Sequence, residues 1–253
     1  MNYDTPPAPP ESVPPPQAVR VSVPESAPYV TYSIIGVTVF VYLLQLATQN
    51  LPFLQYDIPA LFFIKSNELI RSGQIWRLLT PALLHGSIAH IAFNMYALFS
   101  FGVGLERNFG HGRYLLLYAL GAFSGNVASF ILSDANSLGA STAVFGLIGA
   151  EGIFLYQNRR MFAGQFGKAI QNVIFIVAIN LFLGLSPGID NWGHIGGLLG
   201  GVIFTWFAGP VWEVEGIPPM LQLVDRRELR DALTGAATVL LIFGALAMWG
   251  MVR

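Results

Sequence analysis

Four polar residues of types that enzymes use in catalysis lie near the starts of apolar segments in this sequence. Ser141 lies in the glycine-rich stretch "GASTAVFGLIGAEG", and His194 lies in "DNWGHIGGLLGG". His90 and Asn94 are four residues apart in "HGSIAHIAFNMYALF", a spacing that puts both on one face of a helix. A serine hydroxyl becomes a nucleophile when a neighbouring base accepts its proton, and neutral histidine can do so near physiological pH. These residue types are therefore candidates for acyl-transfer chemistry.

A metal site is the competing chemical interpretation, and it would be built from His85, His90 and His194. The sequence has no cysteine, so it offers no thiolate ligand, thiolate nucleophile or disulfide. His85 and His90 are five residues apart, so on a helix they would point about 140° away from each other. No Asp or Glu lies at the depth of these histidines to complete a usual ligand set. We therefore expect neither a metal nor a cofactor.

The composition indicates an integral membrane protein. Of the 253 residues, 54% are hydrophobic and 11% are charged, whereas soluble domains contain about 25% charged residues. The net charge of −1 argues against a nucleic-acid partner. A membrane helix needs roughly 20 mostly apolar residues, and seven segments are long enough and almost free of charge. We predict these spans at 29–48, 87–104, 113–133, 140–157, 168–186, 191–208 and 234–252.

The predicted spans divide the chain into four parts: a disordered, proline-rich cytoplasmic tail at 1–28, a six-span core at 29–208, a cytoplasmic linker at 209–233, and a seventh transmembrane helix at 234–253. The tail lacks the apolar stretch of a signal peptide. Within the core, the long loop at 49–86 mixes aromatic, aliphatic and charged residues. We expect this loop to be interfacial, in the outer headgroup region.

Basic residues alternate between the connections of these spans. Lys and Arg concentrate in cytoplasmic loops, and the loops 134–139 and 187–190 contain neither. The N-terminus is therefore expected in the cytoplasm and the C-terminus outside. The basic residues that favour this orientation are Arg107, Arg113, Arg159, Arg160, Lys168, Arg226, Arg227 and Arg230.

With this orientation, the second, fourth and sixth spans all enter the membrane from the outer face. Their four polar residues then share one layer, about 5–10 Å below the surface. Polar groups at this depth are costly, which favours a functional role for them. However, serine can bond back to its own helix and asparagine can join two helices.

Gly193, Gly197 and Gly201 give the sixth span a small-residue face. That face would let the fourth and sixth spans pack closely, with or without a catalytic purpose.

Five motifs resemble those of the rhomboid family of intramembrane serine proteases. "GASTAVFGLIGA" is similar to the family's GxSx motif, "GHIGGLLGG" to its histidine-bearing sixth span, and "HIAFN" to its HxxxN motif. "GLERNFG" resembles the end of the family's second span, and "IWRLLT" resembles the Trp-Arg of its first loop. Together the motifs cover roughly residues 75–205 in the family's order.

The resemblance implies an all-α polytopic membrane protein, with a rhomboid-like six-helix bundle and an additional seventh helix. It implies Ser141 as the nucleophile and His194 as the general base, with His90, Asn94 and the Ser141 backbone N–H stabilising the oxyanion. The expected partners are the lipid bilayer and single-pass transmembrane substrates, cut near the outer face of a bacterial inner membrane. Thr142 stands where many members have glycine, so we expect it to narrow the substrate pocket.

Two other functions stay open on the sequence. A catalytically silent, rhomboid-like scaffold would bind membrane helices without cutting them, although the presence of Ser141 and His194 argues against it. A transporter would predict internal repeats and charged residues at mid-membrane depth. Only Glu151 fits that pattern, and we expect it to make a buried hydrogen bond. His85, in the loop before the second span, is expected to matter much less than the catalytic pair.

Overall fold

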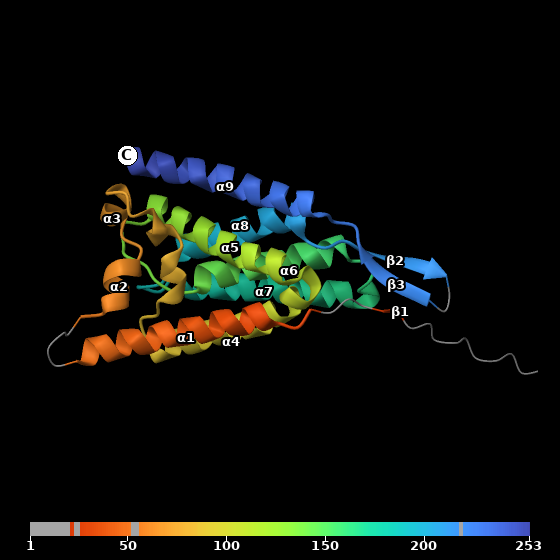
Figure 1. Cartoon of the computed structure of the whole chain (residues 1–253), viewed down its shortest axis with the longest axis horizontal. Coiled ribbons are helices and arrows are strands. Elements are labelled where there is room, and N and C mark those ends of the chain that lie inside the picture. The colour runs from red at the N-terminus through yellow and green to blue at the C-terminus, as the bar shows by residue number, and fades with distance from the viewer. Residues whose placement is uncertain (1–20, 23–25, 52–55, 218–219) are drawn as a thin grey trace, which may run out of the picture.

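The structure, a computed structural model, describes residues 21–22, 26–51, 56–217 and 220–253. Most of the predicted tail therefore lies outside the described residues. The long helices run roughly along one axis, with a lobe of short helices at one end and a small sheet at the other (Figure 1). The elements are β1 (Val21–Ser22), α1 (Tyr29–Asn50), α2 (Ile58–Phe63), α3 (Asn67–Arg71), η1 (Ile75–Leu78), η2 (Thr80–Leu83), α4 (Ile88–Phe109), α5 (His111–Leu132), α6 (Ser141–Gln157), η3 (Ala163–Gln165), α7 (Phe166–Leu183), α8 (Asn191–Ala208), β2 (Trp212–Ile217), β3 (Met220–Asp225) and α9 (Leu229–Val252).

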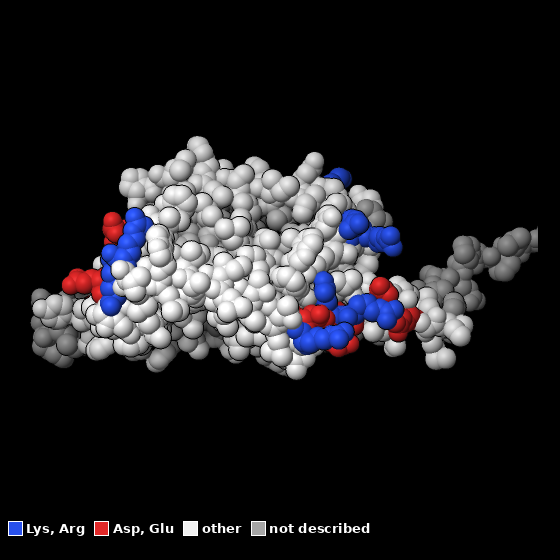
Figure 2. Space-filling view, turned by 90° about the horizontal axis from the view of Figure 1, so that it is seen from above, with Lys and Arg blue, Asp and Glu red and all other residues white. Residues whose placement is uncertain are grey.

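A long helix covers each of the seven predicted spans. In the described part of the chain, α1, α4, α5, α7 and α9 have the length and apolar composition of a membrane span. Charged side chains gather at the two ends of the molecule and leave a band between them without charge on the face shown in Figure 2. The expectation of an all-α polytopic membrane protein is confirmed.

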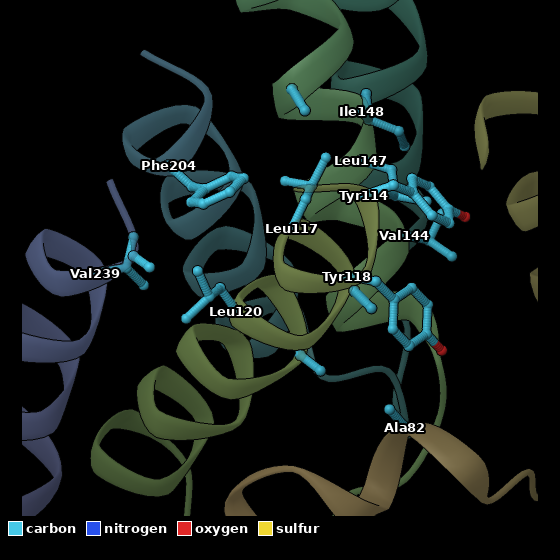
Figure 3. Close-up of a cluster of buried hydrophobic side chains, with 14 of the residues drawn as sticks. Ala82, Tyr114, Leu117, Tyr118, Leu120, Val144, Leu147, Ile148, Phe204 and Val239 are labelled. Atoms are coloured by element: carbon cyan, nitrogen blue, oxygen red, sulfur yellow. The ribbon is translucent and has the colours of Figure 1, made fainter. Parts of the chain in front are cut away.

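The hydrophobic core is centred on α5 and α6. Because α6 packs against α4, α5, α7 and α8, most of its side chains are buried. By contrast, α7 buries only Val173 and lies at the edge of the bundle. Figure 3 shows core side chains from four helices: Leu117 and Leu120 of α5, Leu147 and Ile148 of α6, Phe204 of α8 and Val239 of α9.

Glycines let α6 and α8 approach until their backbones touch. A Cβ atom on Gly197 would lie 2.0 Å from the carbonyl oxygen of Thr142, and one on Gly201 would lie 2.0 Å from that of Gly146. Real Cβ atoms essentially never come within 3.0 Å of another group, so only glycine permits this spacing. The fourth and sixth spans therefore do pack closely through small residues, as the spacing of the glycines allows.

A buried carboxylate attaches α1 to the rest of the bundle. Glu106, near the end of α4, accepts hydrogen bonds from the N–H of Val30 at 2.8 Å and from the N–H and hydroxyl of Thr31 at 2.7 and 2.6 Å. The first N–H groups of a helix have no acceptor within it, and Pro28 supplies no side-chain cap. Glu106 therefore caps α1, and it also bonds the imidazole of His111 at 2.7 Å.

The loop at 49–86 contains a folded lobe formed by α2, α3, η1 and η2. Two of its basic side chains are buried. Lys65 Nζ donates to the carbonyl oxygens of Ser133 and Ala135, both at 2.8 Å, and burial lowers the pKa of Lys65 to about 8. Arg77 donates to two carbonyl oxygens within the lobe. These charges hold the lobe together and fasten it to the α5–α6 connection, while its place in the headgroup region stays a prediction.

The predicted linker at 209–233 contains a β-hairpin that the sequence analysis did not anticipate. β2 and β3 pair antiparallel, and β1 joins β3 in parallel, which gives the strand order β1-β3-β2. An ion pair between Asp225 and Arg113 attaches the hairpin to the start of α5. α9 then begins at Leu229, behind a capping box and earlier than predicted.

Replacing Gly201 by alanine is expected to destabilise the protein, because the new Cβ meets the Gly146 backbone, which can yield only if a helix shifts. Overpacking of this kind costs about 1–3 kcal/mol. In Gly244→Ala, the matched control, the new Cβ has no neighbour within 4 Å, and alanine favours the helix by about 1 kcal/mol. Thermal unfolding in detergent should show a lower melting temperature for Gly201→Ala only. An unchanged melting temperature in Gly201→Ala would contradict the close helix contact.

Candidate active site

Ser141 and His194 are in hydrogen-bond contact. Ser141 is the first residue of α6, and His194 lies near the start of α8. Both helices start at the end of the bundle that carries α2 and α3 (Figure 1). The distance from Ser141 Oγ to His194 Nε2 is 3.0 Å. His194 is 7% exposed, whereas Ser141 is partly exposed. This arrangement can pass the hydroxyl proton to the imidazole and so activate the serine.

Packing, rather than a carboxylate, holds the His194 ring. Phe145, one turn after Ser141 on α6, stacks on the imidazole with ring centroids 4.3 Å apart and planes 9° apart. Among the described residues, His194 Nδ1 is buried without a hydrogen-bond partner. The side chain of Asp190 caps α8 by accepting from the N–H of Gly193 at 2.9 Å. The described residues therefore place no acid at Nδ1, and Phe145 packs on the face of the ring instead.

His90 lies beside Ser141 because a glycine leaves room for it. A Cβ atom on Gly139 would lie 2.8 Å from His90 Nε2 and 3.6 Å from Ser141 Oγ. Gly139 has a φ of +134°, which also favours glycine. His90 Nδ1 accepts a long hydrogen bond, 3.5 Å, from the N–H of Gly86. In the neutral ring, the proton is then on Nε2, so the nitrogen next to Gly139 is a donor.

Asn94 and the start of α6 offer further donors. The Asn94 side chain is 7% exposed, and its Nδ2 donates to the carbonyl oxygen of His90, one turn earlier, at 3.0 Å. The described residues give it no bond to another helix, so the interpretation as interhelical glue gains no support. Because an amide nitrogen has two N–H bonds, one remains for another acceptor. The N–H of Ser141, the first residue of its helix, also has no acceptor within that helix.

His85 lies in the loop before α4, as predicted, but it is buried against the site. Its ring meets that of His90 edge to face, with centroids 5.0 Å apart, and its Nε2 accepts from the N–H of Ala140 at 3.4 Å. In the part of the chain that the structure describes, no three His, Asp or Glu side chains are arranged to hold a metal ion. These contacts are not evident from the sequence, because the path of the loop, not a helical period, creates them.

Two residues differ from their expected surroundings. Thr142 was expected to narrow the substrate pocket, but it is 3% exposed and packs between α5 and α8. A Cβ on Gly125 would lie 2.5 Å from its Cβ, and one on Gly193 would lie 3.0 Å from its Cγ2. The expectation was wrong because the neighbouring helices enclose this side chain.

Glu151 is half-buried, and the described residues include no hydrogen-bond partner for it, so the expected buried hydrogen bond is not found there.

The sequence matches the model of the rhomboid domain over residues 72–211, which is more than half of the chain and includes Ser141, His194, His90 and Asn94. The rhomboid protease GluP of Bacillus subtilis (strain 168) is 49% identical over 141 residues, which cover 55% of this chain and 27% of that protein. RHOMBOID-like protein 7 of Arabidopsis thaliana is 40% identical over 151 residues, 58% of this chain and 48% of that protein. RHOMBOID-like protein 9, chloroplastic, of Arabidopsis thaliana is 34% identical over 159 residues, with 62% and 37% covered. The matched segments thus span less than half the length of each of these relatives.

Proposed function

Because the chain belongs to the rhomboid family, we propose that it is an intramembrane serine endopeptidase that cleaves transmembrane-anchored substrates near one membrane face. The observation that carries the proposal is the 3.0 Å contact between Ser141 Oγ and His194 Nε2 in a bundle of apolar helices. Polar groups in such a bundle are costly and are retained mainly for function. A silent scaffold would not need this contact.

In the first half of the proposed reaction, Ser141 Oγ attacks the scissile carbonyl carbon while its proton passes to His194 Nε2. The carbonyl oxygen becomes an oxyanion, and its donors are the N–H of Ser141, the Nε2–H of His90 and the second Nδ2–H of Asn94. His194 then gives its proton to the leaving amine as the C–N bond breaks. The acyl group remains on Ser141 as an ester.

In the second half, a water molecule attacks the ester carbonyl while His194 Nε2 takes one of its protons. The ester C–O bond breaks, the proton returns to Ser141 Oγ, and the carboxyl product leaves. Partial exposure of Ser141 supports this step, because water must reach the serine. The site lies towards one end of the bundle rather than at its middle (Figure 1), so we expect water to enter from that end.

The proposed substrates are single-pass transmembrane proteins. A helical backbone satisfies its own N–H and C=O groups, so the substrate must unwind locally before its scissile carbonyl can reach Ser141. Glycine or proline near the cleavage point lowers the cost of unwinding, because both disfavour a helix. Substrates with such residues close to the membrane surface should therefore be cut fastest.

We propose that the end of the bundle with Ser141 faces outwards across a bacterial inner membrane, with the N-terminus in the cytoplasm and the C-terminus outside. The positive-inside rule supports this orientation, because cytoplasmic connections are enriched in Lys and Arg. Figure 2 shows the charged clusters at the two ends. At the end opposite the site, the helix ends and the connections between them carry Arg107, Arg113, Arg159, Arg160, Lys168, Arg226, Arg227 and Arg230.

Ser141→Ala and His194→Ala are each expected to abolish cleavage of a transmembrane substrate while the protein stays folded. A fluorophosphonate probe, which reacts with activated serines, should label wild type and not Ser141→Ala. The double variant should be no slower than either single variant, since nucleophile and base act as one unit. Full turnover by purified His194→Ala would overturn the dyad.

The variant Asn94→Ala tests whether the Asn94 side chain is an oxyanion donor or only a structural amide. Removal of one oxyanion donor lowers kcat by about 10²–10³, whereas loss of a hydrogen bond inside a membrane protein costs roughly 0.6 kcal/mol of stability. We expect kcat to fall at least about tenfold with little change in melting temperature. Normal turnover per folded molecule, together with a lower melting temperature, would leave Asn94 with a packing role only.

Cysteine labelling tests the orientation, and the native chain contains no cysteine to interfere. Asn136 and Gly164 are both exposed, uncharged and at opposite ends of the bundle, so Asn136→Cys and Gly164→Cys form a matched pair. In intact cells, a membrane-impermeant maleimide should label Asn136→Cys alone, and inverted membrane vesicles should show the reverse. The opposite pattern in cells would refute an outward-facing site.

A further inference from the structure

His85 lies near the site but has no role in the proposed mechanism. It is 2% exposed, and its backbone N–H donates to Gln45 Oε1 at 3.0 Å. Gln45, itself buried in α1, donates in turn to Asp57 Oδ2 at 2.7 Å, and Asp57 caps α2. The backbone of His85 is therefore held by α1 and, through Asp57, by the lobe. Its ring faces the site, against His90.

The imidazole of His85 acts on the backbone just before the nucleophile. Its Nε2 accepts from the N–H of Ala140 at 3.4 Å, so in the neutral ring the proton is on Nδ1. Ala140 is fully buried, and a buried N–H without an acceptor is unfavourable. Burial, with His90 as its neighbour, lowers the pKa of His85 to about 3. The ring therefore stays neutral near physiological pH, and Nε2 remains an acceptor.

We propose that His85 is a positioning residue that holds the Gly139–Ala140 peptide in place and so aims the oxyanion donors on either side of it. One of these donors is the N–H of Ser141, the residue that directly follows Ala140. The other is the Nε2–H of His90, which lies against Gly139. If the Ala140 N–H loses its acceptor, this peptide can rotate, and both donors move relative to the substrate carbonyl. The inference rests on the proposed protease activity.

A positioning role predicts an effect on kcat rather than on KM. His85→Phe keeps an aromatic ring of similar size beside His90 but removes the acceptor. It should lower kcat at least about tenfold, less than the loss of a direct donor, with KM within about threefold because the substrate contacts remain. The rate of fluorophosphonate labelling of Ser141 should fall in parallel. His85→Gln, which carries an acceptor on a side chain of similar reach, should restore most of kcat.

The matched control is His111→Phe, at the opposite end of the bundle. This change also removes an imidazole hydrogen bond, to Glu106 at 2.7 Å, so it reports the cost of losing such a bond away from the site. It should change the melting temperature and leave kcat per folded molecule as in wild type. If His85→Phe does not fold, the comparison of His85→Gln with His85→Met, which lacks an N or O acceptor, tests the same point.

The outcomes are distinct. Reduced kcat in His85→Phe or His85→Met, with recovery in His85→Gln, supports the positioning role. Wild-type kcat per folded molecule in the variants without an acceptor, or a His85→Gln variant as slow as they are, overturns it. In either case the proposed protease activity stands if wild type cleaves substrate and Ser141→Ala does not. A wild-type protein that neither cleaves substrate nor reacts with the probe overturns both proposals.

Discussion

The backbones of α6 and α8 are in direct contact, and this contact determines how far apart Ser141 and His194 lie. Gly197 and Gly201 bring α8 against the carbonyl groups of α6 so closely that no side chain fits between them. Ser141 and His194 lie near the starts of these two helices and therefore come within 3.0 Å. A separation wider by one methyl group would break that hydrogen bond, since such bonds weaken beyond about 3.2 Å. The distance between the Ser141 and His194 side chains is thus set by main-chain packing.

Backbone groups hold buried charges at both ends of the bundle. Glu106 binds the free N–H groups at the start of α1, and Lys65 binds carbonyl oxygens of the α5–α6 connection. A buried charge is tolerated when hydrogen bonds satisfy it, so each of these residues also fixes the segment that it binds. The connection held by Lys65 leads to Gly139, where His90 lies beside Ser141. The bonds of Lys65 therefore stabilise both the lobe and the connection that leads to the proposed oxyanion site.

Much of the fold follows from the sequence, because hydropathy marks the spans and the spacing of small residues marks the pairing of α6 with α8. The stacking of Phe145 on His194 could also have been found, since Phe145 lies one turn after Ser141. The contact of His85 with Ala140 could not, because it depends on loop paths that have no period. The hairpin could have been found too, since the residues Trp212, Glu213, Val214 and Glu215 of β2 alternate apolar and charged, the pattern of a half-buried strand. The burial of Thr142 depends on three helices at once, and a single sequence does not specify that packing.

We infer that the glycine contact between α6 and α8 makes Ser141 reactive, because it holds His194 against the serine. The rate at which a fluorophosphonate probe labels Ser141 in Gly197→Ala tests this inference. A Cβ at this position would lie 2.0 Å from the Thr142 carbonyl oxygen, whereas one at Gly36 in α1 would have no neighbour within 4 Å. We predict that Gly197→Ala reacts at least about tenfold more slowly than wild type while remaining folded, because the general base moves away from the serine, and that Gly36→Ala reacts normally. Labelling of folded Gly197→Ala at the wild-type rate would contradict the claim.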